Sequence, residues 1–103
     1  MRFVRPKSLN NDAIILDVRT AEEHRKMALK AAHAHIELAK LKPREFIREN
    51  ELNDEQTVNI LCASGNRASQ AAEMFEKAGF ENVAVIIGGI VEAEYEGLEM
   101  VRH

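Results

Sequence analysis

The sequence predicts an α/β protein with a parallel β-sheet flanked by helices on both faces. Three short apolar runs, at 14–18, 57–61 and 82–87, are each followed by a segment with helical spacing. Strands covered on both faces are apolar throughout, and alternation of such strands with helices is typical of a parallel sheet. We expect one domain over residues 1–103, because a chain of this length suits a single modest core.

The first strand, at 14–18, is followed by a helix start. Thr20 and Glu23 have capping-box spacing, in which the hydroxyl and the carboxylate bond reciprocally to the first turn. The pattern predicts that this helix runs toward Ala31. We expect supporting structural roles for three residues of this turn: Arg19 pairs with Glu23, and Asp17 accepts backbone N–H bonds.

The remaining elements follow in order along the chain. A short strand is expected within 33–38, and a helix over 43–49 with proline in its first turn. After the second apolar run, a helix begins at about Asn66 and ends at Gly79, which has the position of a C′ glycine. The third run is followed by a glycine pair and a short helix at 91–95.

Binding sites of parallel sheets form outside the carboxyl ends of the strands. Asp17, Cys62 and Gly88 each follow an apolar run. The sequence therefore predicts that these three residues share one edge of the sheet.

Cys62 lies between the second predicted strand and the helix that follows it. A turn that enters a helix presents backbone N–H groups and the positive end of the helix dipole, which favour an anion such as a thiolate. Gly65 can adopt the positive φ that turns loop amides inward, and Arg67 adds a permanent cation. A lone cysteine at a strand end is often only a small core residue, but these neighbours favour a reactive thiol.

Composition limits the partners and the setting. The net charge of −3 gives no basic field for nucleic acid, and no apolar stretch approaches the length of a membrane span. One cysteine cannot form an internal disulfide, and the N-terminus has no signal-peptide pattern. We expect a cytoplasmic protein that binds neither nucleic acid nor membrane; the oligomeric state is left open.

Motifs in a fixed order carry a family resemblance. They are Asp17-Val18-Arg19 with Glu23, the loop Cys62-Ala63-Ser64-Gly65-Asn66-Arg67, Phe80-Glu81-Asn82-Val83, Gly88-Gly89-Ile90 and Gly97-Leu98. With them the chain resembles the single-domain rhodanese family of sulfurtransferases over roughly residues 14–100.

The resemblance implies a two-step sulfur transfer without cofactor or metal. Cys62 would be the nucleophile that carries a persulfide, with Arg67 as a second catalytic residue. Loop amides and side chains would bind the substrate; these residues are Ala63, Ser64, Gly65, Asn66 and Arg67. The implied partners are a small sulfur donor such as thiosulfate or a polysulfide, and an acceptor that is cyanide, a thiol or a protein thiol.

Alternatives remain open beside sulfur transfer. Four residues separate Cys62 from Arg67, whereas the related cysteine phosphatases have five, which disfavours a phosphatase. The family's glycines and proline are missing from 27–36, and residue 63 is alanine where many members have arginine, which leaves room for a binding or regulatory module. An exposed thiolate would also suit a redox sensor.

Three histidines, at 24, 33 and 35, could suggest a metal site. No cysteine or carboxylate partner is identifiable near them in the sequence. We therefore expect solvated or partly buried histidines.

Overall fold

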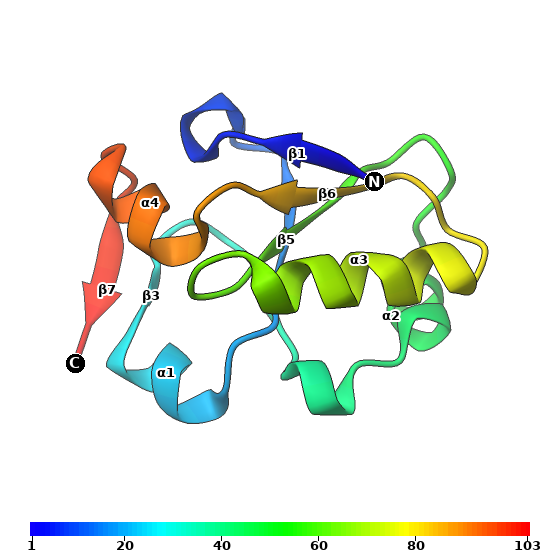
Figure 1. The fold of residues 1–103 in the computed structure, drawn as a ribbon, viewed down its shortest axis with the longest axis horizontal. Coiled ribbons are helices and arrows are strands. Elements are labelled where there is room, and N and C mark those ends of the chain that lie inside the picture. Colours follow the sequence, from blue (N-terminus) through cyan, green and yellow to red (C-terminus); the bar gives the residue numbers. More distant parts are fainter.

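The computed structural model describes residues 1–103 and has a five-stranded parallel sheet with four α-helices (Figure 1). The strand order in the sheet is β1-β6-β5-β2-β4, and every pair is parallel. Its strands are β1 (Arg2–Val4), β2 (Ile14–Asp17), β4 (Ala34–His35), β5 (Val58–Leu61) and β6 (Val83–Ile86). The α-helices are α1 (Ala21–Lys26), α2 (Pro43–Glu49), α3 (Asn66–Lys77) and α4 (Gly89–Tyr95), and two 3-10 turns are η1 (Pro6–Ser8) and η2 (Leu38–Lys40).

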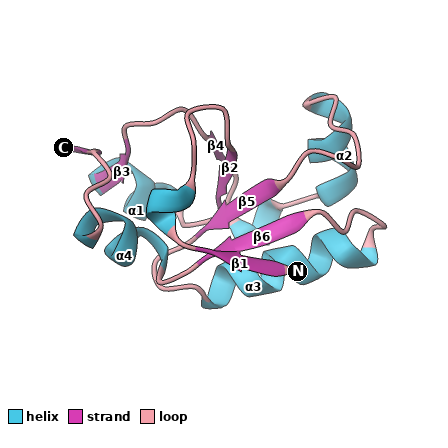
Figure 2. Ribbon diagram, turned by 90° about the horizontal axis from the view of Figure 1, so that it is seen from above, coloured by secondary structure: helices cyan, strands magenta, loops and turns pink.

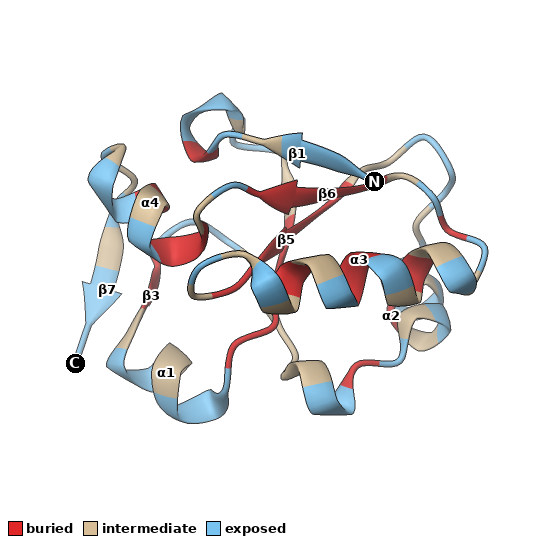
Figure 3. Ribbon diagram, in the orientation of Figure 1, coloured by how far each residue is buried: buried red, intermediate tan, exposed pale blue.

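The sheet is covered on both faces, as the sequence predicts. On one face, buried alanines of α3 and Phe75 join a core with Ile60 and Val85 of the central strands, and Phe46 of α2 joins the same core. Figure 3 shows how buried and exposed positions alternate along α3. On the other face, Ile90 and Ala93 of α4 pack with residues of β2, β5 and β6.

The helices gather at different ends of the sheet. Helices α1 and α4 lie at one end and α2 at the other (Figures 1 and 2). The longest helix is α3, with 12 residues. No helix of the protein combines the length and the apolar character that a membrane crossing requires.

Helix α1 is shorter than predicted. It ends at Lys26 instead of running toward Ala31, and the next residues form β3 (Met27–Leu29). This strand pairs antiparallel with β7 (Met100–Arg102) in a separate two-stranded sheet. Pairing with a distant segment outweighs the helical propensity of alanine and leucine here. The edge strand β1 was also not predicted.

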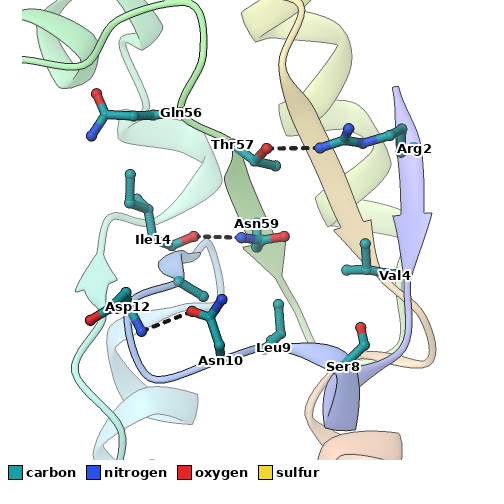
Figure 4. A pocket seen from close by; sticks show the side chains of 11 residues that line it. Arg2, Val4, Ser8, Leu9, Asn10, Asp12, Ile14, Gln56, Thr57 and Asn59 are labelled. Carbon is teal, nitrogen blue, oxygen red and sulfur yellow. Dashed lines mark hydrogen bonds between the residues drawn. The ribbon is translucent and has the colours of Figure 1, made fainter.

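One polar residue is buried in the central strand. Asn59 of β5 is 7% exposed, and its side-chain amide donates to the Ile14 carbonyl at 3.1 Å. It lines an open pocket of about 400 Å³, together with Arg2 and Asp12 (Figure 4). The pocket lies at the amino ends of the strands, at the opposite end of the sheet from Cys62.

Candidate functional site

The carboxyl ends of the central strands come together, which confirms the predicted shared edge. Asp17 at the end of β2 lies in register with Leu61 of β5. The Val18 N–H donates to the Leu61 carbonyl at 2.9 Å, and the Ile90 N–H donates to the Cys62 carbonyl at 2.8 Å. The loop after β5 is therefore held between β2 and the start of α4.

The loop curls back onto the sulfur of Cys62. Gly65 has a φ of +119° at the N-cap of α3, and its N–H lies 2.8 Å from Cys62 Sγ. Cys62 itself is 1% exposed and belongs to the core that packs against α3. The sulfur therefore receives a backbone donor at the positive end of a 12-residue helix.

The other residues predicted to bind substrate form this loop and the first turn of α3. Ala63, Gly65 and Arg67 are half-buried, whereas Ser64 and Asn66 are exposed. The backbone N–H groups of Ala63, Ser64, Asn66 and Arg67 donate to no protein acceptor. Unpaired amides at the start of a helix are available to an anionic ligand.

Gly89 allows α4 to approach the loop closely. A Cβ at this position would lie 2.4 Å from the carbonyl oxygens of both Cys62 and Ala63. The residue also has a φ of +62°. Only glycine fits this contact without movement of the backbone.

Arg67 is held by a carboxylate of α1. Its guanidinium donates to both oxygens of Glu23, at 2.6 and 2.8 Å. These hydrogen bonds lower the pKa of Glu23 from its ordinary 4.5 to about 2, and the same contact raises the pKa of Arg67. Glu23 also completes the predicted capping box with Thr20. One carboxylate thus ties the start of α1 to the first turn of α3.

The predicted ion pair between Arg19 and Glu23 is wrong. The guanidinium of Arg19 instead holds both oxygens of Asp17, with the shortest contact 2.8 Å from Nη2 to Oδ2. Arg19 precedes the N-cap, so its side chain does not lie on the surface of the helix near Glu23. In extended backbone, residues two positions apart point to the same side, which places Arg19 beside Asp17. The expected backbone bond to Asp17 is confirmed, since the Arg19 N–H donates to Oδ1 at 2.9 Å.

The histidines are partly buried, as expected, and they also form a cluster that sequence reasoning missed. His24 Nε2 lies 2.8 Å from His33 Nε2, and the rings of His24 and His35 stack with centroids 4.1 Å apart. Burial is the largest cause that lowers the pKa of His24, and His35 adds to it. The cluster lies beside Asp17, the carboxylate that the sequence did not place near it.

The geometry places the protein in one structural class. Its members are α/β proteins that present one thiol at the carboxyl end of a central parallel strand, next to the N-terminus of a helix. Residues 6–95 match the model of the rhodanese-like domain. The chain therefore belongs to the rhodanese-like family.

Solved structures agree with this assignment. A rhodanese-related protein from Thermoplasma volcanium is 26% identical, with a TM-score of 0.76 and 98% of each chain covered. A rhodanese-like domain protein from Staphylococcus aureus is also 26% identical, with a TM-score of 0.71, 96% of this chain and 97% of that chain covered.

A curated relative carries a functional name. The Bacillus subtilis (strain 168) protein "Putative sulfur carrier protein YrkF" is 37% identical over 76 residues, or 74% of this chain. The match spans only 38% of the length of that relative.

Proposed function

We propose that the protein is a sulfurtransferase that carries sulfane sulfur on Cys62. The observation that carries this proposal is the 2.8 Å contact from the Gly65 N–H to Sγ, within a loop whose other amides are unpaired. Such donors stabilise negative charge on the sulfur and on a terminal persulfide sulfur. Family membership and the name of the Bacillus subtilis relative support the same chemistry.

The proposed reaction has two displacements at sulfur. The Cys62 thiolate attacks the outer sulfur of thiosulfate, the S–S bond of thiosulfate breaks, and sulfite leaves with the electron pair. Cyanide or a thiolate then attacks the outer persulfide sulfur and releases the Cys62 thiolate. The chain has one cysteine, so the acceptor comes from outside it. A polysulfide donor would follow the same course.

Arg67 and the loop amides have distinct roles in this proposal. Glu23 fixes the guanidinium of Arg67 beside the loop, so the cation is in place before a donor arrives. We assign the binding of the anion to the amides of Ala63, Ser64, Gly65 and Asn66, because the Gly65 N–H contacts Sγ and the other three donate to no protein acceptor. Asp17 and Arg19 act as structural residues, because their charges are satisfied by one another.

A thiosulfate-to-cyanide assay for thiocyanate tests the proposal. We expect turnover by the parent protein, none by Cys62→Ser or Cys62→Ala, and full turnover by Gln70→Ala, an exposed position on α3. Thiocyanate formation that survives both cysteine substitutions would refute the role of Cys62.

A binding or regulatory module is the second candidate. It is favoured by the 1% exposure of Cys62 and by the pairing of Arg67 with Glu23, which leaves that cation partly neutralised. A parent protein that is inactive with thiosulfate and with polysulfide, while its thiol can still be alkylated, would favour this candidate. The low exposure of Cys62 also disfavours a peroxide sensor, since oxidation follows access.

A further inference from the structure

The histidine cluster gathers side chains that can bind a metal ion. Three of the four histidines of the chain converge from α1, from the β3–β4 connection and from β4. The Nε2 atoms of His24 and His33 face each other at 2.8 Å. An oxygen of Asp17, which is fully buried, lies within 4.8 Å of a ring nitrogen of each of these two histidines.

The tautomer of His33 is fixed by its other nitrogen. His33 Nδ1 lies 2.8 Å from the Ala31 carbonyl oxygen, which can only accept a hydrogen bond. Nδ1 therefore carries the proton, and the lone pair of the neutral ring is on Nε2, directed at His24. A backbone carbonyl that binds one ring nitrogen and orients the other is the usual support of a histidine metal ligand.

His35 positions the second ligand. Its ring stacks on His24 with an interplanar angle of 9°, and its own Nε2 is 2.9 Å from the Arg19 carbonyl oxygen. That contact uses Nε2 of His35 as a donor, so His35 does not offer this nitrogen to an ion. The stacking restricts rotation of the His24 ring and holds its Nε2 toward His33.

We infer that His24 and His33 bind a divalent first-row transition-metal ion, with zinc as the best-suited probe. Zinc–nitrogen bonds of about 2.0–2.1 Å at tetrahedral angles separate two nitrogens by about 3.3 Å, so the imidazoles would have to part by about half an ångström. Asp17 lies beside the site, but both of its oxygens are held by Arg19, so the two imidazoles are the protein ligands. Water fills the remaining positions. The inference is independent of sulfur transfer.

Calorimetric titration with Zn²⁺ in the Cys62→Ser background tests this site without interference from the thiol. We expect one ion per chain, with binding lost in His24→Ala and in His33→Ala. His103→Ala is the matched control, because His103 is exposed at the end of the chain, and it should bind as the parent does.

A second measurement guards against variants that fail to fold. Zn²⁺ should raise the Tm of the parent and of His103→Ala, and should leave the Tm of a cooperatively unfolding His33→Gln unchanged. The inference is overturned if the parent shows no saturable binding at submillimolar Zn²⁺, or if folded His33→Gln binds as tightly as the parent.

Discussion

Gly89 lies so close to the backbone of the cysteine loop that no side chain fits at this position. Its missing side chain lets the first turn of α4 rest on the carbonyls of Cys62 and Ala63. The Ile90 N–H then reaches the Cys62 carbonyl at 2.8 Å. The position of the cysteine loop thus depends on a residue outside it.

Gly89→Ala should cost more than left-handed strain alone. Gly79→Ala is the matched control: Gly79 has a φ of +93°, and no atom lies within 4 Å of the position that a Cβ would take, so it should lose about 1–2 kcal/mol of stability. Gly89→Ala should lose more and shift the amide resonances of the loop. Urea unfolding and NMR measure the two effects, and equal losses with an unmoved loop would contradict this account.

The ion pair of Glu23 with Arg67 is partly solvent-exposed, at 36% and 30% of the two side chains, so its coupling should be modest. A double-mutant cycle with Glu23→Gln and Arg67→Gln should give about 0.5–1 kcal/mol at neutral pH. Glutamine preserves the capping box, so the cycle isolates the pair.

The control is a second double-mutant cycle, in which Glu22 is mutated in place of Glu23. Glu22 forms its ion pair with Lys26 and not with Arg67. Urea unfolding should show no coupling between Glu22→Gln and Arg67→Gln. A coupling as large as that of Glu23 would mean that no specific contact joins α1 to α3.

At the residue scale, the sequence located the cysteine loop and Asp17 well, because both follow apolar runs that local periodicity reveals. The partners of the arginines were not predictable in the same way. Arg67 meets Glu23 across 44 positions of sequence, and only the packing of α1 against the loop brings them together. The histidine cluster was missed because the end of α1 at Lys26 and the strand β3 that follows, which the sequence did not predict, set where His24 lies relative to His33.

Among the elements, α3 and the central strands were predicted because each carries its own signal. The helix has buried alanines at helical spacing, and Gly79, with its positive φ, directly follows the C-cap residue Ala78. The β3–β7 pair has no such signal, since Leu29 meets Met100 only through the tertiary fold. Short strands at the sheet margin depend on their neighbours more than on their own composition.

Helix α3 depends on one aromatic side chain. Phe75 is fully buried, and its ring meets those of Phe46 and Phe80 edge-on at 5.9 and 6.1 Å. Phe75→Ala should cost about 3–5 kcal/mol because it leaves a cavity where α2 and α3 meet.

Urea unfolding should show a smaller loss for Phe75→Leu, and almost none for Glu73→Ala at an exposed position of the same helix. If Phe75→Ala costs no more than Glu73→Ala, the aromatic contact does not hold α2 to α3.

At the scale of the whole molecule, the residues that stabilise the fold and the residues of the candidate site lie in different places. The two cores on either side of the sheet fix the strands, and the carboxyl ends of those strands carry the cysteine loop, the buried Asp17–Arg19 pair and the histidine cluster. In the proposed function this single thiol accepts a sulfur atom, and the chain has no second cysteine to remove it. Turnover therefore requires an acceptor molecule.

Intact mass spectrometry tests the central claim most directly. The reduced protein is incubated with thiosulfate or polysulfide, the donor is removed, and the mass is compared with that of Cys62→Ser. We predict one added, cyanide-labile sulfur atom on the parent and none on the variant. No added sulfur from either donor, on a protein whose Cys62 can still be alkylated, would contradict the claim that Cys62 carries sulfur.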